Sequence, residues 1–198
     1  MNSRNYDVVI VGGSAAGITA GVTTRRHYHD KSILLIRKEK QVLIPCGIPY
    51  IFGTVGKPEN DLIPDAVLDK HDIDLHVGSV KKVNVDDRVI GLADGNEVGY
   101  ERLVLATGGM PIELPISGMD KENIFSIKKN IPYLKNMLEV LKDTDQLVIV
   151  GGGFIGIELA DECNKKYDMD VTIVEILPRC LDQAFDDEFC DAAENLLE

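Results

Sequence analysis

The sequence predicts an α/β fold with two parallel-sheet domains, of which the second is present only in its first part. A short β-branched run, a glycine-rich turn and a helical pattern follow one another at residues 8–26, and the same series returns at 147–160. Between them, strand and turn signals at 74–92 predict a small antiparallel insert. Because strand–turn–helix units build parallel sheets, the repeat predicts two domains, which we place at residues 1–118 and 119–198.

The first glycine turn follows the strand Val8–Val11 and leads into a helix. Small side chains let the backbone approach a pyrophosphate there, and the helix N-terminus directs unpaired N–H groups toward the negative charge. The turn consists of Gly12, Gly13, Ser14, Ala15, Ala16 and Gly17. Since Ser14 stands at the middle glycine of G-x-G-x-x-G, this turn alone is weak evidence, and a strand–turn–helix without a ligand is an open alternative.

The second glycine turn carries the dinucleotide spacing in full. It consists of Gly151, Gly152, Gly153, Phe154, Ile155 and Gly156. The next strand, Val171–Val174, is closed by Glu175, about 20 residues after the last glycine, where an acid binds the ribose hydroxyls. A carboxylate at this place repels a 2′-phosphate and so favours NADH over NADPH, although Arg179 could soften the preference.

The corresponding strand of the first domain, Ser32–Ile36, is followed by Arg37, Lys38 and Glu39. Glu39 is the nearest acid, and Arg37 stands where the ribose-binding acid is expected. The ribose contact is left open among these three residues, and a solvated charge run is an equal alternative. Further helices are expected at 61–71, 131–141 and 186–197, and further strands at 74–77, 81–85, 89–92 and 100–105.

Composition argues against several classes of protein. The chain has 198 residues, a net charge of −12 and no basic cluster, which disfavours a nucleic-acid binder. No apolar segment reaches the length of a membrane span, and the four cysteines are too sparse for a disulfide scaffold, so we expect a cytoplasmic protein without a membrane partner. The cysteines and the four histidines show no spacing of a metal site. The helix at 186–197 has an apolar face that a complete sheet would cover, so we expect a fragment of a longer protein.

Two dinucleotide turns one domain apart, with Ala106, Thr107 and Gly108 between them, resemble the pyridine nucleotide-disulfide oxidoreductase family. The resemblance implies that the first turn binds the FAD pyrophosphate and that the backbone near Val80 meets the adenine. It places Ala106, Thr107 and Gly108 with the cofactor-binding residues, at the end of the strand where the chain leaves the flavin domain. The second turn and Glu175 would bind NAD(H), and Glu158 would lie near the junction of flavin and nicotinamide.

The segment Cys46-Gly47-Ile48-Pro49-Tyr50 resembles the single-cysteine branch of this family. That branch includes coenzyme A-disulfide reductases, NADH oxidases and peroxidases, and persulfide or polysulfide reductases. Pro45 is placed with the cofactor-binding residues, and Tyr50 with either the flavin or the packing. We expect Cys46 at a helix start, where the dipole favours the thiolate.

The implied activity passes electrons from NADH through FAD to Cys46. With no second cysteine nearby, the acceptor would be external: a small disulfide such as that of coenzyme A, a persulfide, a peroxide or oxygen. The resemblance also implies a homodimer for the full-length protein. Three alternatives stay open: a structural Cys46, a nucleotide-binding module without turnover, and a flavin reductase for a ferredoxin or rubredoxin in which Cys46 is incidental.

Overall fold

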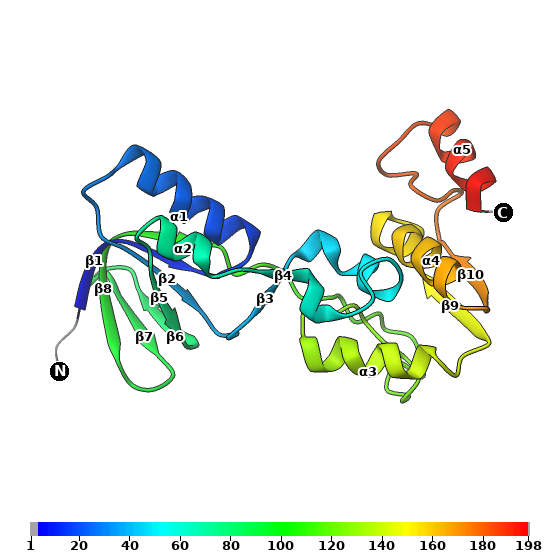
Figure 1. The fold of residues 1–198 in the computed structure, drawn as a ribbon, viewed down its shortest axis with the longest axis horizontal. Helices are drawn as coiled ribbons and strands as arrows, with labels where there is room; N and C mark the ends of the chain where they lie inside the picture. The colour runs from blue at the N-terminus through cyan, green and yellow to red at the C-terminus, as the bar shows by residue number, and fades with distance from the viewer. Residues whose placement is uncertain (1–3, 198) are drawn as a thin grey trace. The chain divides into compact units, whose positions relative to one another are not determined.

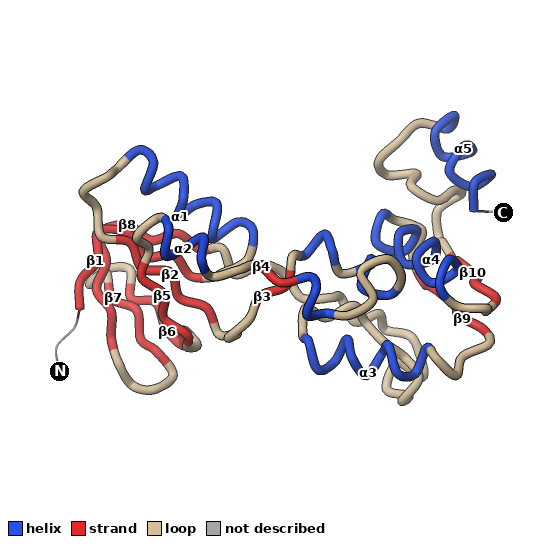
Figure 2. The backbone as a smooth tube through the Cα atoms, viewed as in Figure 1, coloured by secondary structure: helices blue, strands red, loops and turns tan. Residues whose placement is uncertain are grey.

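The computed structural model describes residues 4–197. Within them the chain divides into two compact units, one of residues 4–45 and 62–110, the other of residues 46–61 and 111–197. Figures 1 and 2 show the elements of each unit. The expected limits of the FAD-binding and NAD-binding domains stay a prediction, because these units are defined by packing and not by the nucleotide that each would hold.

The first unit is built on a six-stranded sheet in the order β5-β2-β1-β8-β7-β6. Its strands are β1 (Arg4–Val11), β2 (Ile33–Arg37), β5 (Asp74–Val77), β6 (Val80–Asn84), β7 (Val89–Leu92) and β8 (Glu97–Leu105). The four strands β5, β2, β1 and β8 are parallel, whereas β6 and β7 pair antiparallel with each other and with the start of β8. The predicted α/β class with a small antiparallel insert is therefore confirmed.

Alternating side chains of the central strands serve two separate cores. On one face Ile10 and Leu35 pack in a cluster with Ile18 of α1 (Ala15–His27) and Leu68 of α2 (Ala66–Lys70). Both helices lie over this face of the sheet (Figure 1). On the other face Val9, Val11 and Ile36 pack with Ile90 of β7. Because successive side chains of a strand point to opposite faces, a strand segment that is covered on both sides is apolar at every position, as β1 is over residues 8–11 and β2 over residues 33–36.

The predicted helix over residues 61–71 is wrong in its first half. Leu62 and Ile63 form β4, which pairs antiparallel with β3 (Val42–Leu43), and the helix is limited to Ala66–Lys70. Pro64 explains the difference. Proline has no N–H to donate, and it disfavours the helical conformation of the residue before it, so the chain stays extended up to this point.

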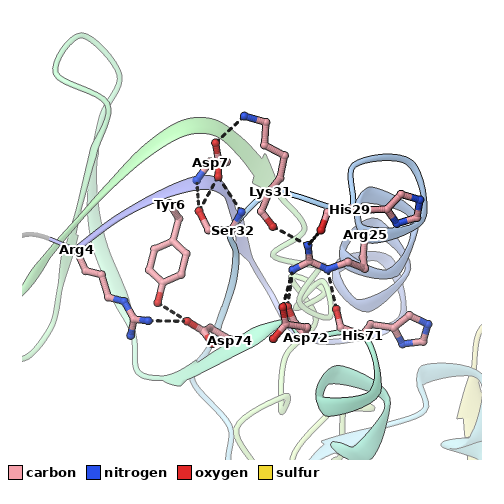
Figure 3. A network of polar contacts seen from close by, with 10 residues as sticks. All are labelled: Arg4, Tyr6, Asp7, Arg25, His29, Lys31, Ser32, His71, Asp72 and Asp74. Carbon is pink, nitrogen blue, oxygen red and sulfur yellow. Dashed lines mark hydrogen bonds and ion pairs between the residues drawn. The ribbon is translucent and has the colours of Figure 1, made fainter.

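A polar network fixes the amino ends of the parallel strands (Figure 3). Arg25 of α1 donates to the backbone carbonyls of His29 and Lys31, before β2, and to those of His71 and Asp72, before β5. One guanidinium thus satisfies four carbonyls in two connecting segments and holds α1 to both.

The second unit contains η2 (Pro49–Phe52), η3 (Pro58–Asp61), α3 (Ile131–Leu141), β9 (Gln146–Val150), α4 (Phe154–Lys166), β10 (Asp170–Val174) and α5 (Asp187–Leu197). Strands β9 and β10 form a parallel pair. The predicted helix at 131–141 is confirmed in its bounds, with Leu134 and Leu138 buried. On α5 Cys190 is buried, but the predicted apolar face is largely open, because Phe189 and Leu196 are exposed.

Candidate functional site

The two glycine turns have the same backbone geometry. Gly12 has φ +116° and Gly151 has φ +113°, a region that favours glycine. The N–H of Gly12 donates to the carbonyl of Ile36 and that of Gly151 to the carbonyl of Val174, both at 2.8 Å. Each turn therefore leaves its first strand by the same bond to the neighbouring parallel strand.

The last glycine of each turn is required by the fold itself. A Cβ on Gly17 would overlap the carbonyl oxygen of Gly12, and a Cβ on Gly156 would overlap that of Gly151. The first turn of each helix is thereby packed directly against the start of its loop. This close contact aims the helix N-terminus at the space above the carboxyl ends of the strands, where α/β sheets bind ligands.

The N-terminus of α1 also offers an unpaired hydroxyl. Ser14 is the N-cap of α1, and its side chain makes no capping bond. Among the described residues 4–197, its Oγ is one of two buried side-chain oxygens without a hydrogen-bond partner. A hydroxyl that can donate, beside the free N–H groups of a helix start, fits a phosphate oxygen. The residues of the first turn therefore fit the pyrophosphate of a dinucleotide.

The residues that follow β8 lie against the first turn. The Ala106 N–H donates to the carbonyl of Val11 at 2.8 Å, and a Cβ on Gly12 would overlap the Ala106 carbonyl. Gly108 follows with φ +72°. Val80, in contrast, begins β6 and packs partly buried against the core on the far face from α1, so its predicted contact with the adenine stays a prediction.

In the second turn the middle glycine has no structural reason to be glycine. Gly153 has the ordinary φ of −79°, and no atom lies within 4 Å of the position that its Cβ would take. The turn therefore leaves open space at the N-terminus of α4. A glycine that the protein does not need points to a ligand that approaches the backbone closely.

We expect Gly153→Val to fold like the wild type and to bind NAD(H) at least about tenfold more weakly, because the added side chain enters the space of the pyrophosphate. Titration of NADH binding, together with a thermal melt, measures both effects. Gly156→Ala is the matched control, because it adds its methyl group inside the protein and should lower the melting temperature. Unchanged NADH affinity in Gly153→Val would contradict this assignment of the turn.

Glu175 is held in place by backbone N–H groups of the second glycine turn and of the two residues that follow Glu175. Its Oε1 accepts the N–H groups of Ile176 and Leu177, at 2.7 and 2.9 Å, and its Oε2 accepts that of Gly152 at 2.6 Å. These backbone donors, first of all Leu177 N–H, lower the pKa of Glu175, so the group stays ionised. Since Oε2 has accepted a single bond, it keeps a lone pair for a ribose hydroxyl.

At the equivalent place in the first unit the structure puts Arg37, because the Gly12–Ile36 bond matches the Gly151–Val174 bond. The guanidinium is buried, donates to both carboxylate oxygens of Asp65 at 2.7 and 2.8 Å, and donates to the Glu39 and Lys40 carbonyls. Asp65 was missed by sequence reasoning, because nothing local links residues 28 positions apart. Which of Arg37, Lys38 and Glu39 meets the ribose stays a prediction; the Lys38 ammonium lies 3.3 Å from the Glu39 carboxylate.

Cys46 does not start an α-helix. It lies in η1 (Pro45–Gly47), a single three-residue 3₁₀ turn, so the expected dipole of a long helix is absent at this place and that part of the prediction is wrong. Cys46 is exposed, however, whereas Cys163, Cys180 and Cys190 are buried. Of the four thiols, it is the one that solvent and small molecules reach.

Asp61 is a buried carboxylate beside the cysteine turn that the sequence analysis did not single out. It is 3% exposed, its Oδ2 has no partner among the described residues, and a Cβ on Gly47 would overlap its Oδ1. Burial raises the pKa of Asp61 from 3.8 to about 6. The group therefore titrates about two pH units higher than an exposed aspartate.

Because the folded-state pKa of Asp61 lies above the unfolded value, the folded state loses stability as pH rises from about 4 to about 6, and the cost persists above that range. We expect Asp61→Asn to raise the free energy of unfolding at pH 8 by about 2 kcal/mol more than at pH 4. Urea unfolding at both pH values measures the difference. Glu59→Gln in the same 3₁₀ turn, where Glu59 pairs with Lys135 in partial contact with water, should change stability by less than about 1 kcal/mol. An equal gain at both pH values would contradict the assignment.

Glu158 contacts the segment that follows the cysteine. The Tyr50 hydroxyl lies 3.4 Å from Glu158 Oε1, and the Glu158 charge raises the pKa of Tyr50. Tyr50 is therefore engaged by α4, while its possible approach to a flavin stays a prediction. No group of three possible metal-ligating side chains is found within residues 4–197, and none of the helices described there could span a membrane.

A family model described as pyridine nucleotide-disulphide oxidoreductase matches residues 6–198. The chain belongs to this family. It is 31% identical to an NADH oxidase of Methanocaldococcus jannaschii and 31% identical to an NAD(P)H coenzyme A polysulfide/persulfide reductase of Pyrococcus horikoshii. Each of these matches covers 96% of this chain and 44% of the relative.

Among solved structures, an NAD-dependent persulfide reductase from A. fulgidus superposes with a TM-score of 0.85 at 29% identity, covering 98% of this chain and 38% of that one. The chain therefore spans less than half the length of these relatives. Pyridine nucleotide-disulphide oxidoreductases use FAD and NAD(P)H, and the two glycine turns described above fit those two nucleotides.

Proposed function

We propose that the protein to which this chain belongs is an FAD-dependent NADH oxidoreductase that works through Cys46. The single observation that supports the role of Cys46 best is its exposure: it lies in a turn at the surface, while the other three cysteines are buried. A buried thiol has its pKa raised and is shielded from reagents, as at Cys163, where burial raises the pKa to about 11.

The acceptor that we propose is a small sulfur compound: a disulfide such as coenzyme A disulfide, or a persulfide or polysulfide. The Cys46 thiolate attacks one sulfur of the acceptor, a Cys46–S–S–R bond forms, and the other half leaves as a thiolate. Two electrons and one proton then cleave that bond, release R–SH and restore the Cys46 thiolate. Peroxide is the alternative acceptor: the Cys46 thiolate would attack one peroxide oxygen, the O–O bond would break, hydroxide would leave and a sulfenic acid would form in place of the mixed disulfide. Oxygen would enter this route after two electrons from NADH have reduced it to peroxide.

The chemistry that a bound FAD would supply is the transfer of this electron pair, taken from NADH as a hydride. The chain's own part is to bind and orient both nucleotides. Ser14 and the N–H groups at the start of α1 would hold the FAD pyrophosphate, and those at the start of α4 would hold that of NADH. The ionised Glu175 would accept hydrogen bonds from the ribose hydroxyls of NADH and would repel a 2′-phosphate.

The proposal is tested on the untreated protein in two steps. Anaerobic NADH should bleach the absorbance of the bound flavin, and NADPH should do so much more slowly. Mass spectrometry of the peptide that contains Cys46 should then show a coenzyme A adduct, a persulfide or an added oxygen, which identifies the acceptor class. A protein that holds no flavin would contradict the proposal at its first step.

An unmodified Cys46, together with rapid reduction of a ferredoxin or rubredoxin, would favour the alternative in which electrons pass directly from flavin to an electron-transfer protein. A cytoplasmic location and a homodimer of the full-length protein stay predictions. Fractionation and light scattering test them.

A further inference from the structure

Residues 46–54, which we call the cysteine segment, are held to α4 by one buried carboxylate. Glu162 is 2% exposed, and it accepts both the backbone N–H and the hydroxyl of Thr54, the latter at 3.0 Å. The nearest cation, the Lys165 ammonium, lies 3.8 Å away. The donors that compensate the burial of Glu162 therefore come chiefly from the cysteine segment.

The contact is close at backbone level as well. A Cβ on Gly53 would overlap both the carboxylate and the carbonyl oxygen of Glu162. One helical turn earlier, Glu158 faces the Tyr50 hydroxyl at 3.4 Å. Residues four apart lie on one face of a helix, so these two acids form two successive contacts with η2 and the residues after it.

The helix that makes these contacts is the one that starts at the second glycine turn. Gly153 is the N-cap of α4, and Glu162 lies in its last two turns. The end of the helix that would face the nucleotide and the residues that hold the cysteine segment thus belong to one rigid element. A catalytic thiol must be held within a fraction of an ångström of its working position, and a helix provides such a frame better than a loop does.

We propose that Thr54 and Glu162 are positioning residues for Cys46. Their contact fixes the cysteine segment to α4, the helix that follows the second glycine turn. The inference deepens the proposed function, and it rests on that proposal only for the statement that Cys46 is the redox-active residue. The positioning itself concerns the geometry of the turn. It is therefore measurable without turnover.

The test measures the rate constant at which iodoacetamide alkylates Cys46 in the native full chain, by mapping of the modified peptide. In Glu162→Ala both bonds to Thr54 are lost and the turn that bears Cys46 is no longer fixed to α4. We therefore expect the rate constant of alkylation to change by about fivefold or more, the factor that corresponds to one lost hydrogen bond. Glu162→Gln keeps an acceptor for the N–H and a donor for the hydroxyl oxygen, so it should react within about twofold of the wild type. Rescue by glutamine separates positioning by hydrogen bonds from a general need for charge.

Asp161→Asn is the matched control, because Asp161 is the neighbouring acid on α4 but pairs with Lys165 in contact with water. It should leave the alkylation of Cys46 unchanged. If Glu162→Ala does not fold, Thr54→Val decides by itself, since it removes the hydroxyl at constant shape. A changed rate of Cys46 alkylation supports the proposal, and an unchanged rate overturns it. Failure here leaves the redox role of Cys46 standing, whereas loss of that role in the tests above leaves the contacts of Glu162 unaffected.

Discussion

Cys46→Ser is expected to lower the turnover of a disulfide or persulfide acceptor by at least about 10³-fold, because a serine hydroxyl neither attacks sulfur at neutral pH nor forms the mixed disulfide. Reduction of the bound flavin by NADH should stay within about twofold of the wild type, since no residue of the two glycine turns is changed. Stopped-flow absorbance with and without the acceptor separates the two steps.

Chemical modification provides the control for this variant. Because Cys46 is exposed and the other three cysteines are buried, iodoacetamide on the native wild type should modify Cys46 first. Modification should abolish reduction of the sulfur acceptor and spare reduction of a dye that takes electrons from the flavin. A Cys46→Ser protein that still reduces the sulfur acceptor would show that electrons leave the flavin by another path.

Gly17→Ala is expected to destabilise the fold by about 3 kcal/mol and to abolish retention of FAD. In an open helix position alanine is favoured over glycine by about 1 kcal/mol. Here the added methyl group overlaps the backbone carbonyl of Gly12, which cannot move without displacing the turn, so the overlap outweighs the helix preference. For a chain of this length, the loss corresponds to a melting temperature lower by about 10 °C.

Gly91→Ala is the matched control for Gly17→Ala. It lies in β7, also in the first unit, and the nearest atom to its added Cβ is the Lys82 Cβ at 3.8 Å, an ordinary contact. Its melting temperature and flavin content should equal those of the wild type. If Gly17→Ala melts like Gly91→Ala and keeps its flavin, the close contact between the helix start and Gly12 is not needed for the site.

Local patterns in the sequence suffice for the parallel strands, the two glycine turns and the helices at α1, α3 and α4. Each of these elements is encoded by residues within a few positions of one another, so periodicity and turn chemistry reveal them. The expected helix over residues 61–71 is wrong in its first half for an equally local reason, since Pro64 disfavours the helical conformation of the residue before it. The helix dipole expected at Cys46 is absent because residues 45–47 form a single 3₁₀ turn.

The missed residues share a different property. Asp65, Asp61 and Glu162 act through partners that are distant in sequence or through burial, as in the Thr54–Glu162 contact across 108 positions. A carboxylate in a polar stretch looks like a solvated charge until the fold brings a donor to it or removes water from it. One clue was present for Asp65, because an arginine closing a buried strand needs a counter-ion.

The grouping of residues 46–61 with the carboxyl-terminal half has a practical consequence for anyone who dissects or recombines such proteins. A recombinant protein that starts after residue 110 would lack Thr54 and would leave Glu162 of α4 without its two hydrogen bonds to that residue. We expect such a protein to express poorly. A chimera that exchanges the region equivalent to residues 111–197 between two relatives should therefore exchange the loop equivalent to residues 46–61 as well. This loop carries Cys46, although it precedes the exchanged region by about 50 residues in the sequence.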